Sequence, residues 1–263
     1  MDAQKRETAI SRYVLGETAN QIGQSFGLSG ETIRSVLRHA GKIRSRSEWT
    51  RRYSVNHNCF DSITVDSMYY AGLLMADGNV AKNGRMVQIE LDDKDMELLE
   101  GFKKFLNYNG PIGHRTRFTK KGKCQKMSSL RITSQKIVES LAKFGVAFQK
   151  CRRSHIPDLV LNSSLVKFFL RGMFDGDGCF GIRKGKHSTG RRFAQLGANP
   201  KIASVVREWF VKTIRTTGGL CKRSNLFWAL HYGNADAMTV WKFLYSDQQG
   251  MRLTRKANKF NVP

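Results

Sequence analysis

Two apolar segments of this chain end in the same Asp-Gly pair. They are YAGLLMADG at residues 70–78 and LRGMFDGDG at residues 170–178, so that Asp77 and Asp177 lie 100 residues apart. Around each segment, the spacing of apolar residues predicts the same order of elements: helix, two strands, helix, two strands, helix. A chain that repeats a unit in this way is constrained to fold as two similar halves. We therefore predict an α+β fold of two tandem αββαββα repeats related by a pseudo-twofold axis.

Small residues recur on one face of the two repeated helices. Gly72 and Ala76 are four residues apart, as are Gly172 and Gly176, so each pair lies on one side of its helix. Small side chains at this spacing allow two helix backbones to approach closely. We expect the two helices to pack through these residues, which would bring their C-terminal ends side by side.

Asp77 and Asp177 would then stand at two neighbouring helix C-termini. The helix dipole is negative there, and two carboxylates repel each other, so a positive group must compensate. A divalent metal ion fits, because carboxylates and free backbone carbonyls are hard oxygen ligands. Such an ion on a basic surface indicates phosphodiester chemistry. Asp175, two residues before Asp177, should point elsewhere and is interpreted as structural.

The net charge points to a polyanionic partner. The chain of 263 residues has 45 Lys and Arg against 21 Asp and Glu, a formal net charge of +24. Nucleic acid is the first candidate and an anionic membrane the second. The sequence has no apolar run of spanning length and no secretory signal pattern, so we expect a soluble cytoplasmic protein without a membrane partner. The five cysteines and six histidines lack metal-ligand spacing, so reduced thiols and no zinc are expected.

Residues 1–45 are predicted to form a small all-α helix-turn-helix domain. Residues 3–14 form one helix, and Ala19, Ile22 and Phe26 mark one face of the next. Ser29 is the predicted N-cap of a recognition helix. The residues of that helix predicted to contact DNA are Ser29, Glu31, Thr32, Arg34, Ser35 and Arg38. The alternatives are a helical hairpin that serves only packing, and a solvated charge run after it.

Residues 46–62 are predicted to be a basic linker that follows a phosphate backbone. Around this stretch, Arg44, Arg46 and Arg51 are the expected contacts. Residues 63–155 and 156–263 are the predicted first and second repeats.

The two motifs resemble the paired signature of LAGLIDADG homing endonucleases. The resemblance covers roughly residues 60–263. It implies a monomer whose two four-stranded sheets form a DNA-binding β-saddle, and Mg²⁺-dependent or Mn²⁺-dependent double-strand cleavage of a long, asymmetric DNA site. By position, Asp77 and Asp177 match the family's metal-binding acids, with the carbonyls of Ala76 and Gly176 assisting. Ca²⁺ is expected to bind without supporting cleavage.

The resemblance also suggests further residues around the acids. Lys150 and Lys256 match basic residues that follow each repeat in the family, where they would orient water or offset charge in the transition state. Asp93 and Asn199 match polar residues at the end of each second strand and are predicted at the periphery of the active site.

Two positions depart from the family pattern. Met75 stands where the motif has its first acid, and Arg171 where it has a small residue. Neither occupies a metal-binding position. Arg171 is expected to disturb the helix contact in its half.

Basic side chains on the strands and their loops are predicted to contact DNA. Strands present alternate residues to one face, and an antiparallel pair can enter the major groove. Arg131, Arg183 and Arg223 are the favoured base readers. The alternative for any one of these basic residues is that it only neutralises a phosphate. The full set is Arg85, Arg115, Arg117, Lys120, Lys121, Lys123, Arg131, Arg183, Lys184, Lys186, Arg191, Arg192, Lys222 and Arg223.

Two alternatives to a DNA endonuclease remain open at this point. A non-cleaving transcription regulator could use the same fold, although both acids are present here. An RNA maturase could assist intron splicing with intron RNA as its partner, although a helix-turn-helix unit suits the B-form major groove of double-stranded DNA. The chain has no intein signature, so we expect a free-standing or intron-encoded enzyme of intron mobility, from a bacterium or phage.

Overall fold

The computed structural model describes residues 1–14, 17–43, 53–119, 122, 124–184 and 190–260. Contacts along the chain divide it into two compact units, residues 1–53 and 54–263. Within the described ranges, no helix is both long enough and apolar enough to cross a bilayer.

The described part of the first unit contains the short helices α1 (Ala3–Val14), α2 (Ala19–Ser25) and α3 (Gly30–His39). Thr18 caps the start of α2, and Ser29 caps α3 by accepting a hydrogen bond from the backbone of Thr32 at 3.1 Å. Gly23 allows the turn to fold back, because a Cβ there would lie 2.7 Å from the carbonyl oxygen of Leu28. The buried core of the unit consists of Ala9, Tyr13, Ala19, Ile22, Ile33 and Leu37.

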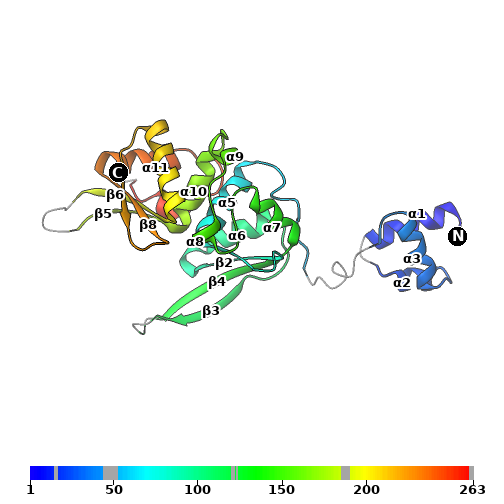
Figure 1. Ribbon diagram of the computed structural model, residues 1–263. Helices are drawn as coiled ribbons and strands as arrows, with labels where there is room; N and C mark the ends of the chain where they lie inside the picture. Colours follow the sequence, from blue (N-terminus) through cyan, green and yellow to red (C-terminus); the bar gives the residue numbers. More distant parts are fainter. Residues whose placement is uncertain (15–16, 44–52, 120–121, 123, 185–189, 261–263) are drawn as a thin grey trace. The chain divides into compact units, whose positions relative to one another are not determined.

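The second unit contains the same series of elements twice (Figure 1). The first repeat comprises α5 (Val65–Asp77), β1 (Gly78–Val80), β2 (Met86–Asp92), the 3₁₀ turn η1 (Asp93–Asp95), α6 (Met96–Phe105), β3 (Gly113–Phe118), β4 (Cys124–Thr133) and α7 (Gln135–Ala142). The second comprises α10 (Val166–Asp177), β5 (Gly178–Ile182), β6 (Arg192–Ala198), α11 (Pro200–Ile214), β7 (Gly219–Lys222), β8 (Trp228–Gly233) and α12 (Asn234–Tyr245). Between the repeats lie α8 (Lys150–Arg153) and α9 (Asp158–Leu161), and α13 (Thr254–Ala257) follows α12.

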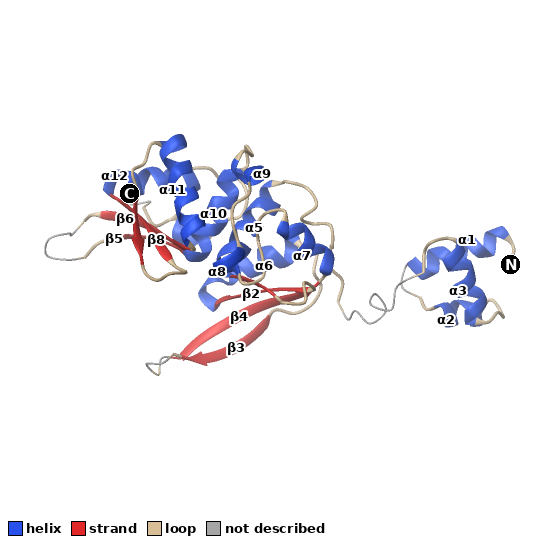
Figure 2. Ribbon diagram, viewed as in Figure 1, coloured by secondary structure: helices blue, strands red, loops and turns tan. Residues whose placement is uncertain are grey.

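Each repeat forms one antiparallel sheet of four strands, ordered β1-β2-β4-β3 and β5-β6-β8-β7. The predicted α+β class with two four-stranded sheets is therefore confirmed. Val87, Ile89 and Leu91 of β2 alternate inward, so one face of the first sheet is buried beneath helices (Figure 2). The opposite face of each sheet is not covered by these helices, and we call it the open face.

The helices α5 and α10 pack directly against each other at the centre of the unit. A Cβ at Gly72 would lie 2.8 Å from the carbonyl carbon of Phe169 and closer still to its oxygen. A Cβ at Gly172 would lie 2.7 Å from the backbone nitrogen of Leu73. Gly176 faces Ala76 in the same contact. All four predicted small residues therefore lie where the two backbones meet.

Arg171 does not disturb this contact, so the expectation that it would is wrong. Its side chain is fully buried on the other side of α10. There its Nε donates a hydrogen bond to the carbonyl of Leu244 at 2.6 Å, and its guanidinium pairs with Asp247 at 2.9 Å. The residue therefore fastens α10 to the end of α12.

The final helix is shorter than the sequence predicts. The basic segment MRLTRKANKF, residues 251–260, is interpreted from its sequence as a final helix, whereas α13 covers only Thr254–Ala257. The backbone N–H of Leu253 donates to Asp175, and that of Thr254 donates to Glu97. Contacts distant in sequence thus fix the chain before α13 in a non-helical path.

Candidate active site

Asp77 and Asp177 line one cavity of about 220 Å³, at the C-terminal ends of α5 and α10. Each helix passes straight into a strand, because Gly78 and Gly178 follow in extended conformation. A Cβ at Gly78 would lie 2.8 Å from the Cα of Leu74, so glycine permits this abrupt junction. The close packing of the two helices brings their terminal acids to the same place.

Both carboxyl groups hold their protons more strongly than free aspartate does. Burial raises the pKa of Asp77, and the positive charges of Lys150 and Lys256 oppose this shift only in part. Burial, followed by the negative charge of Asp77, raises the pKa of Asp177 to about 6. Asp177 as a residue is open to solvent although its carboxyl group is crowded, so water screens part of the effect. A cation between the acids would relieve the remaining excess of negative charge.

Lys256 caps the C-terminal end of α10. The residue is 5% exposed, and its Nζ donates to the carbonyls of Phe174, Asp175 and Gly176 at 2.8, 2.6 and 3.1 Å. Burial lowers the pKa of Lys256, and nearby carboxylates oppose that shift. An ammonium at this position neutralises the negative end of the helix dipole.

Lys150, the first residue of α8, occupies the matching position at the C-terminal end of α5. Its Nζ donates to the carbonyl of Ala76, in the last turn of α5. The cavity lining includes Lys150 together with Asp77, Asp177 and Asn199. Both predicted lysines therefore reach the ends of the acid-bearing helices, and both bind the carbonyl that was predicted to assist a metal ion.

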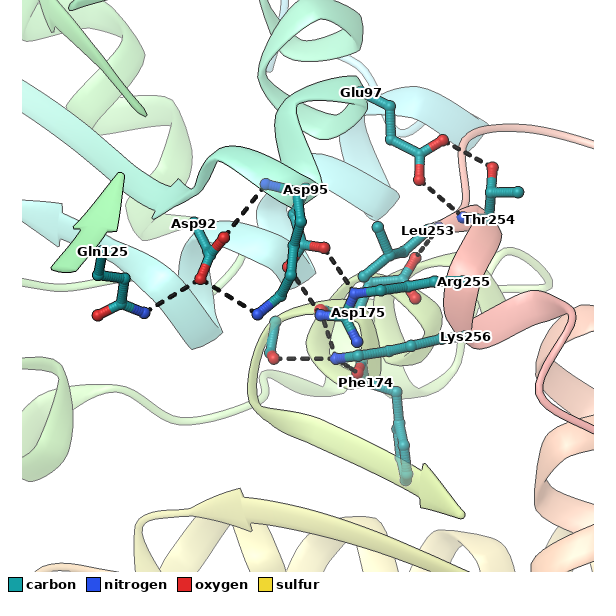
Figure 3. Close-up of polar contacts among 12 residues, drawn as sticks. Asp92, Asp95, Glu97, Gln125, Phe174, Asp175, Leu253, Thr254, Arg255 and Lys256 are labelled. Atoms are coloured by element: carbon teal, nitrogen blue, oxygen red, sulfur yellow. Dashed lines mark hydrogen bonds and ion pairs between the residues drawn. The ribbon is translucent and has the colours of Figure 1, made fainter. Parts of the chain in front are cut away.

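The segment that carries Lys256 is held by the first repeat (Figure 3). The Arg255 guanidinium forms two hydrogen bonds with Asp95, at 2.6 and 2.7 Å. The backbone and hydroxyl of Thr254 donate to Glu97 at 2.9 and 2.6 Å. Residues 253–257, which follow the second repeat, are thus clamped to the start of α6.

The segment that carries Lys150 is held by the second repeat in a corresponding way. The Asn199 side chain caps α11 by accepting from the backbone of Ile202 at 2.9 Å. Its amide nitrogen donates to the carbonyl of Ser154 at 2.9 Å and to that of Lys150 at 3.4 Å. We call residues 150–154 and 253–257 the crossing segments, because each follows one repeat and is fastened to the other.

Asp175 occupies a buried position behind the cavity. Its carboxylate accepts hydrogen bonds from the hydroxyls of Tyr69 and Tyr245, at 2.7 and 2.6 Å, and from the backbone of Leu253 at 2.8 Å. Burial raises its pKa, whereas these three hydrogen bonds oppose the shift. The group ties α5, α12 and a crossing segment to α10, which agrees with the structural interpretation of this residue.

Asp93 and Asn199, predicted as a pair, take different places. Asp93 accepts a hydrogen bond from Ser128 and is not one of the described residues that line the acid cavity. The register pairs Gly78 with Ile89 and Gly178 with Leu196. Three residues further along each strand are Asp92 and Asn199, so Asp92 is the counterpart of Asn199.

Sequence reasoning missed two apolar residues at the cavity. Leu226 and Phe227, in the turn between β7 and β8, line it beside the acids. Leu226 also borders an adjoining cavity of about 390 Å³ that contains Asp77, Gln149 and Arg152. The signal in the sequence that could have identified them is the presence of two large apolar residues in an otherwise polar turn.

Arginines of the first repeat gather on its open face. The register places Arg115 opposite Met127 and Asp92, and Arg131 opposite Gln88. Arg115 pairs with Glu90 at 2.6 Å, and Arg117 follows on the same side of β3. Arg85 is exposed in the loop before β2. The predicted contacts Lys120, Lys121 and Lys123 lie outside the described residues.

The basic residues of the second repeat divide between the two faces of its sheet. Arg183 lies over the ring of Phe193 on the open face, and Arg183 and Arg223 both influence His231. Arg192 instead lies over Phe260 on the helix side. Lys222 is exposed, but its register opposite Trp228 and Ala198 also places it on the helix side. Lys184 and Arg191 are exposed, whereas Lys186 lies outside the described residues.

In the first unit, several predicted contact residues bind one another. Glu31 accepts hydrogen bonds from Arg34 at 2.7 Å and from Arg38 at 2.6 Å, all at the surface. Ser29 and Thr32 share the helix cap, and the Ser35 carbonyl contacts His39. Arg44, Arg46 and Arg51 lie outside the described residues.

The acid cavity fits a hard divalent cation. Among the residues that the structure describes, no group of three or more His, Cys, Asp or Glu could hold a metal ion. The protein would supply the carboxylates of Asp77 and Asp177, with the carbonyls of Ala76 and Gly176 nearby and already bound by lysines. Mg²⁺ is held in this way, by one or two carboxylates, several waters and substrate phosphates.

Residues 64–144 match the protein family described as LAGLIDADG-like domain. The fold is similar to that of the homing endonuclease I-WcaI bound to its DNA recognition sequence, with 16% identity, a TM-score of 0.57, and coverage of 77% of this chain and 90% of that one. A lysine-to-alanine mutant of I-SmaMI is similar as well, with 12% identity, a TM-score of 0.50, and coverage of 74% and 86%. No curated protein matches the chain in sequence. At these identities, the structural likeness shows the fold.

Proposed function

We propose that this protein is a site-specific DNA endonuclease of the homing type, making Mg²⁺-dependent double-strand breaks in a long, asymmetric target. The observation that carries the proposal is the pair of acids, Asp77 and Asp177, brought into one cavity by two tightly packed helices. The net charge of +24 supplies the attraction to DNA. The fold shared with I-WcaI, which binds a DNA recognition sequence, supports the same partner.

In this mechanism, Asp77 and Asp177 would hold the metal ions, and one acid would serve each DNA strand. Bound Mg²⁺ would stabilise the attacking and leaving oxygens of the phosphodiester and lower the pKa of water. The raised pKa of both acids means that cation binding is coupled to loss of protons. Cleavage should therefore rise with pH as Asp177 ionises.

The two lysines are set for different roles. An ammonium has three hydrogens to donate, and Lys256 directs hydrogen bonds to three carbonyls of α10. It therefore positions the end of that helix. The one hydrogen bond described for the Lys150 ammonium goes to the Ala76 carbonyl, so this ammonium retains donors for a phosphate oxygen or a water.

The first unit would act as a tethered helix-turn-helix contact. Its α3 presents Arg34 and Arg38, and Glu31 holds both guanidinium groups in defined positions. A second DNA contact on the same chain raises the effective concentration and lengthens the recognised site. We propose that a single chain binds the whole target, as an asymmetric site requires.

The test is cleavage of a target selected from a randomised duplex library. Mg²⁺ should support double-strand breaks and EDTA should stop them. Asp77→Asn and Asp177→Asn should each abolish the breaks or leave only nicks. Asp158→Asn changes an exposed aspartate of α9 and should cut normally. Tight binding without cleavage under Mg²⁺ and Mn²⁺ would refute the enzyme and favour a DNA-binding regulator.

A further inference from the structure

The open face of the second sheet is largely apolar and consists mainly of phenylalanine, glycine and alanine. On this face, Phe193 of β6 lies between Gly181 of β5 and Gly233 of β8. Further along β6, Gly197 pairs with Ala229 of β8. Gln195 and His231 are the polar residues between them. A face that binds only phosphates needs cationic side chains rather than rings and glycines.

Two aromatic rings on this side of the sheet are seated on glycines. A Cβ at Gly181 would lie 2.7 Å from the ring of Phe193, and a Cβ at Gly197 would lie 2.8 Å from Cε2 of Phe227. Both rings thus occupy space that any other residue would fill. Phe227 remains 41% exposed, and Phe193 is partly exposed. The rings are therefore held in place and still accessible.

The first sheet, with the same topology, has a different open face. Gln88, Glu90 and Arg131 lie there, and Arg131 donates to Gln88 at 3.2 Å while Glu90 pairs with Arg115. That face offers hydrogen-bonding groups. Since both sheets have the same strand order, the contrast arises from side chains and not from the fold.

The surroundings of the apolar face suit DNA. Arg183 and Arg223 border it, and Arg183 lies against the ring of Phe193. Burial, followed by the charges of Arg223 and Arg183, lowers the pKa of His231 and so favours the neutral form of this imidazole. A protein surface with an apolar centre and a cationic border is complementary to a DNA groove, which is bordered by anionic phosphates and can present an apolar group on its base edges.

In the major groove, the apolar group on a base edge is the C5 methyl of thymine. We propose that the second repeat reads thymine methyl groups through Phe193 and Phe227, whereas the first repeat reads its half-site through hydrogen bonds. The half-site under the second repeat is therefore rich in A·T pairs. The inference rests on the proposed binding of double-stranded DNA.

The test replaces thymine by deoxyuridine, which removes only the methyl group. A preferred site is first selected from a randomised duplex library in Ca²⁺, and affinity is then measured with each thymine replaced in turn. Loss of one buried methyl should weaken binding about fourfold at each contacted position. The effect should be confined to one half of the site.

Matched variants assign the effect to the second repeat. Phe193→Ala and Phe227→Ala should each remove the discrimination between thymine and uracil at one or more positions. Phe118→Ala changes an aromatic residue that is 70% exposed on the first repeat and should leave the discrimination intact. If Phe193→Ala does not fold, Phe227→Ala decides, because its ring lies in an exposed turn.

Equal affinity for thymine and uracil sites would overturn the inference, as would a uracil effect that survives in both variants. Cleavage with no uracil effect would leave the endonuclease standing and refute the thymine-reading face. A uracil effect without any cleavage would support the thymine-reading face and refute the endonuclease. Failure to bind duplex DNA at all would refute both.

Discussion

Substitution of Gly72 by alanine tests whether the central helices are packed as closely as described. The added Cβ would meet the backbone of Phe169 on α10, with the carbonyl carbon at 2.8 Å and the oxygen closer. Real Cβ atoms essentially never come within 3.0 Å of such atoms. A flexible side chain could move aside, but the obstacle is a helix backbone. Because of this, the two helices must separate.

Overpacking of this kind costs about 3 kcal/mol at the upper end of its usual range. Alanine offsets about 1 kcal/mol of that cost, because it favours a helix more than glycine does. The net expectation is a loss of about 2 kcal/mol in the free energy of unfolding. For a unit of this size, that corresponds to a fall in Tm of about 4–8 °C. Cleavage should fall as well, because Asp77 and Asp177 move apart.

The assay is thermal unfolding followed by circular dichroism, with cleavage measured on the same preparations. Gly219→Ala is the matched control, since a Cβ at that position of β7 meets no atom within 4 Å. Its Tm should stay close to that of the wild type. If Gly72→Ala unfolds at the same temperature as the control and cuts normally, the close contact between α5 and α10 is refuted.

Three further predictions concern charged groups. Asp177→Asn should stabilise the protein at pH 7 by about 1 kcal/mol, a value reduced for solvent screening. The reason is that the folded-state pKa of Asp177, about 6, lies above the usual pKa of an aspartate, so the ionised group opposes folding. Wild-type stability from this group should therefore increase as pH falls from 7 through 6, and urea unfolding at pH 7 and 5 that shows no difference between the proteins would contradict this. Asp95→Asn should loosen the segment that carries Lys256 and slow cleavage of one strand more than that of the other, so nicked DNA should accumulate. Asp61→Asn breaks an ion pair with Lys136 of α7, away from the crossing segments, and should not change the ratio of the two strand cleavages. Glu31→Gln should weaken DNA binding a few-fold although it removes a negative charge, because two arginines lose their support, and tighter binding in a titration would show that net charge alone decides.

The order of elements and the acid pair could be predicted because they depend on local patterns. Periodicity fixed the helices and strands, and the two Asp-Gly pairs marked the helix ends that meet at the cavity. The prediction failed where partners lie far apart in sequence. From the sequence of its own helix, Arg171 is expected to disturb packing. In the structure it fastens α10 through Leu244 and Asp247, which are more than seventy residues away.

The cavity shows the same division. Asp77 and Asp177 carry a local signature, whereas Asp95 has none, because its partner Arg255 is 160 residues further on. Leu226 lines the same cavity from the turn between β7 and β8, at a position distant in sequence from both acids. The spacing of residues along the chain indicates which side chains share one face of a helix. It does not indicate which distant loop will pack beside that face.

The crossing segments limit how this protein could be rebuilt from parts. The lysine at the end of α10 depends on Asp95 and Glu97 of the other half, and the lysine at the end of α5 depends on Asn199. A chimera that joins one half to a foreign half would lose the anchor of both lysines, even with both acids and both sheets retained. Exchange of halves must therefore carry the anchoring residues of the opposite half along, and the smallest transferable piece is larger than one repeat.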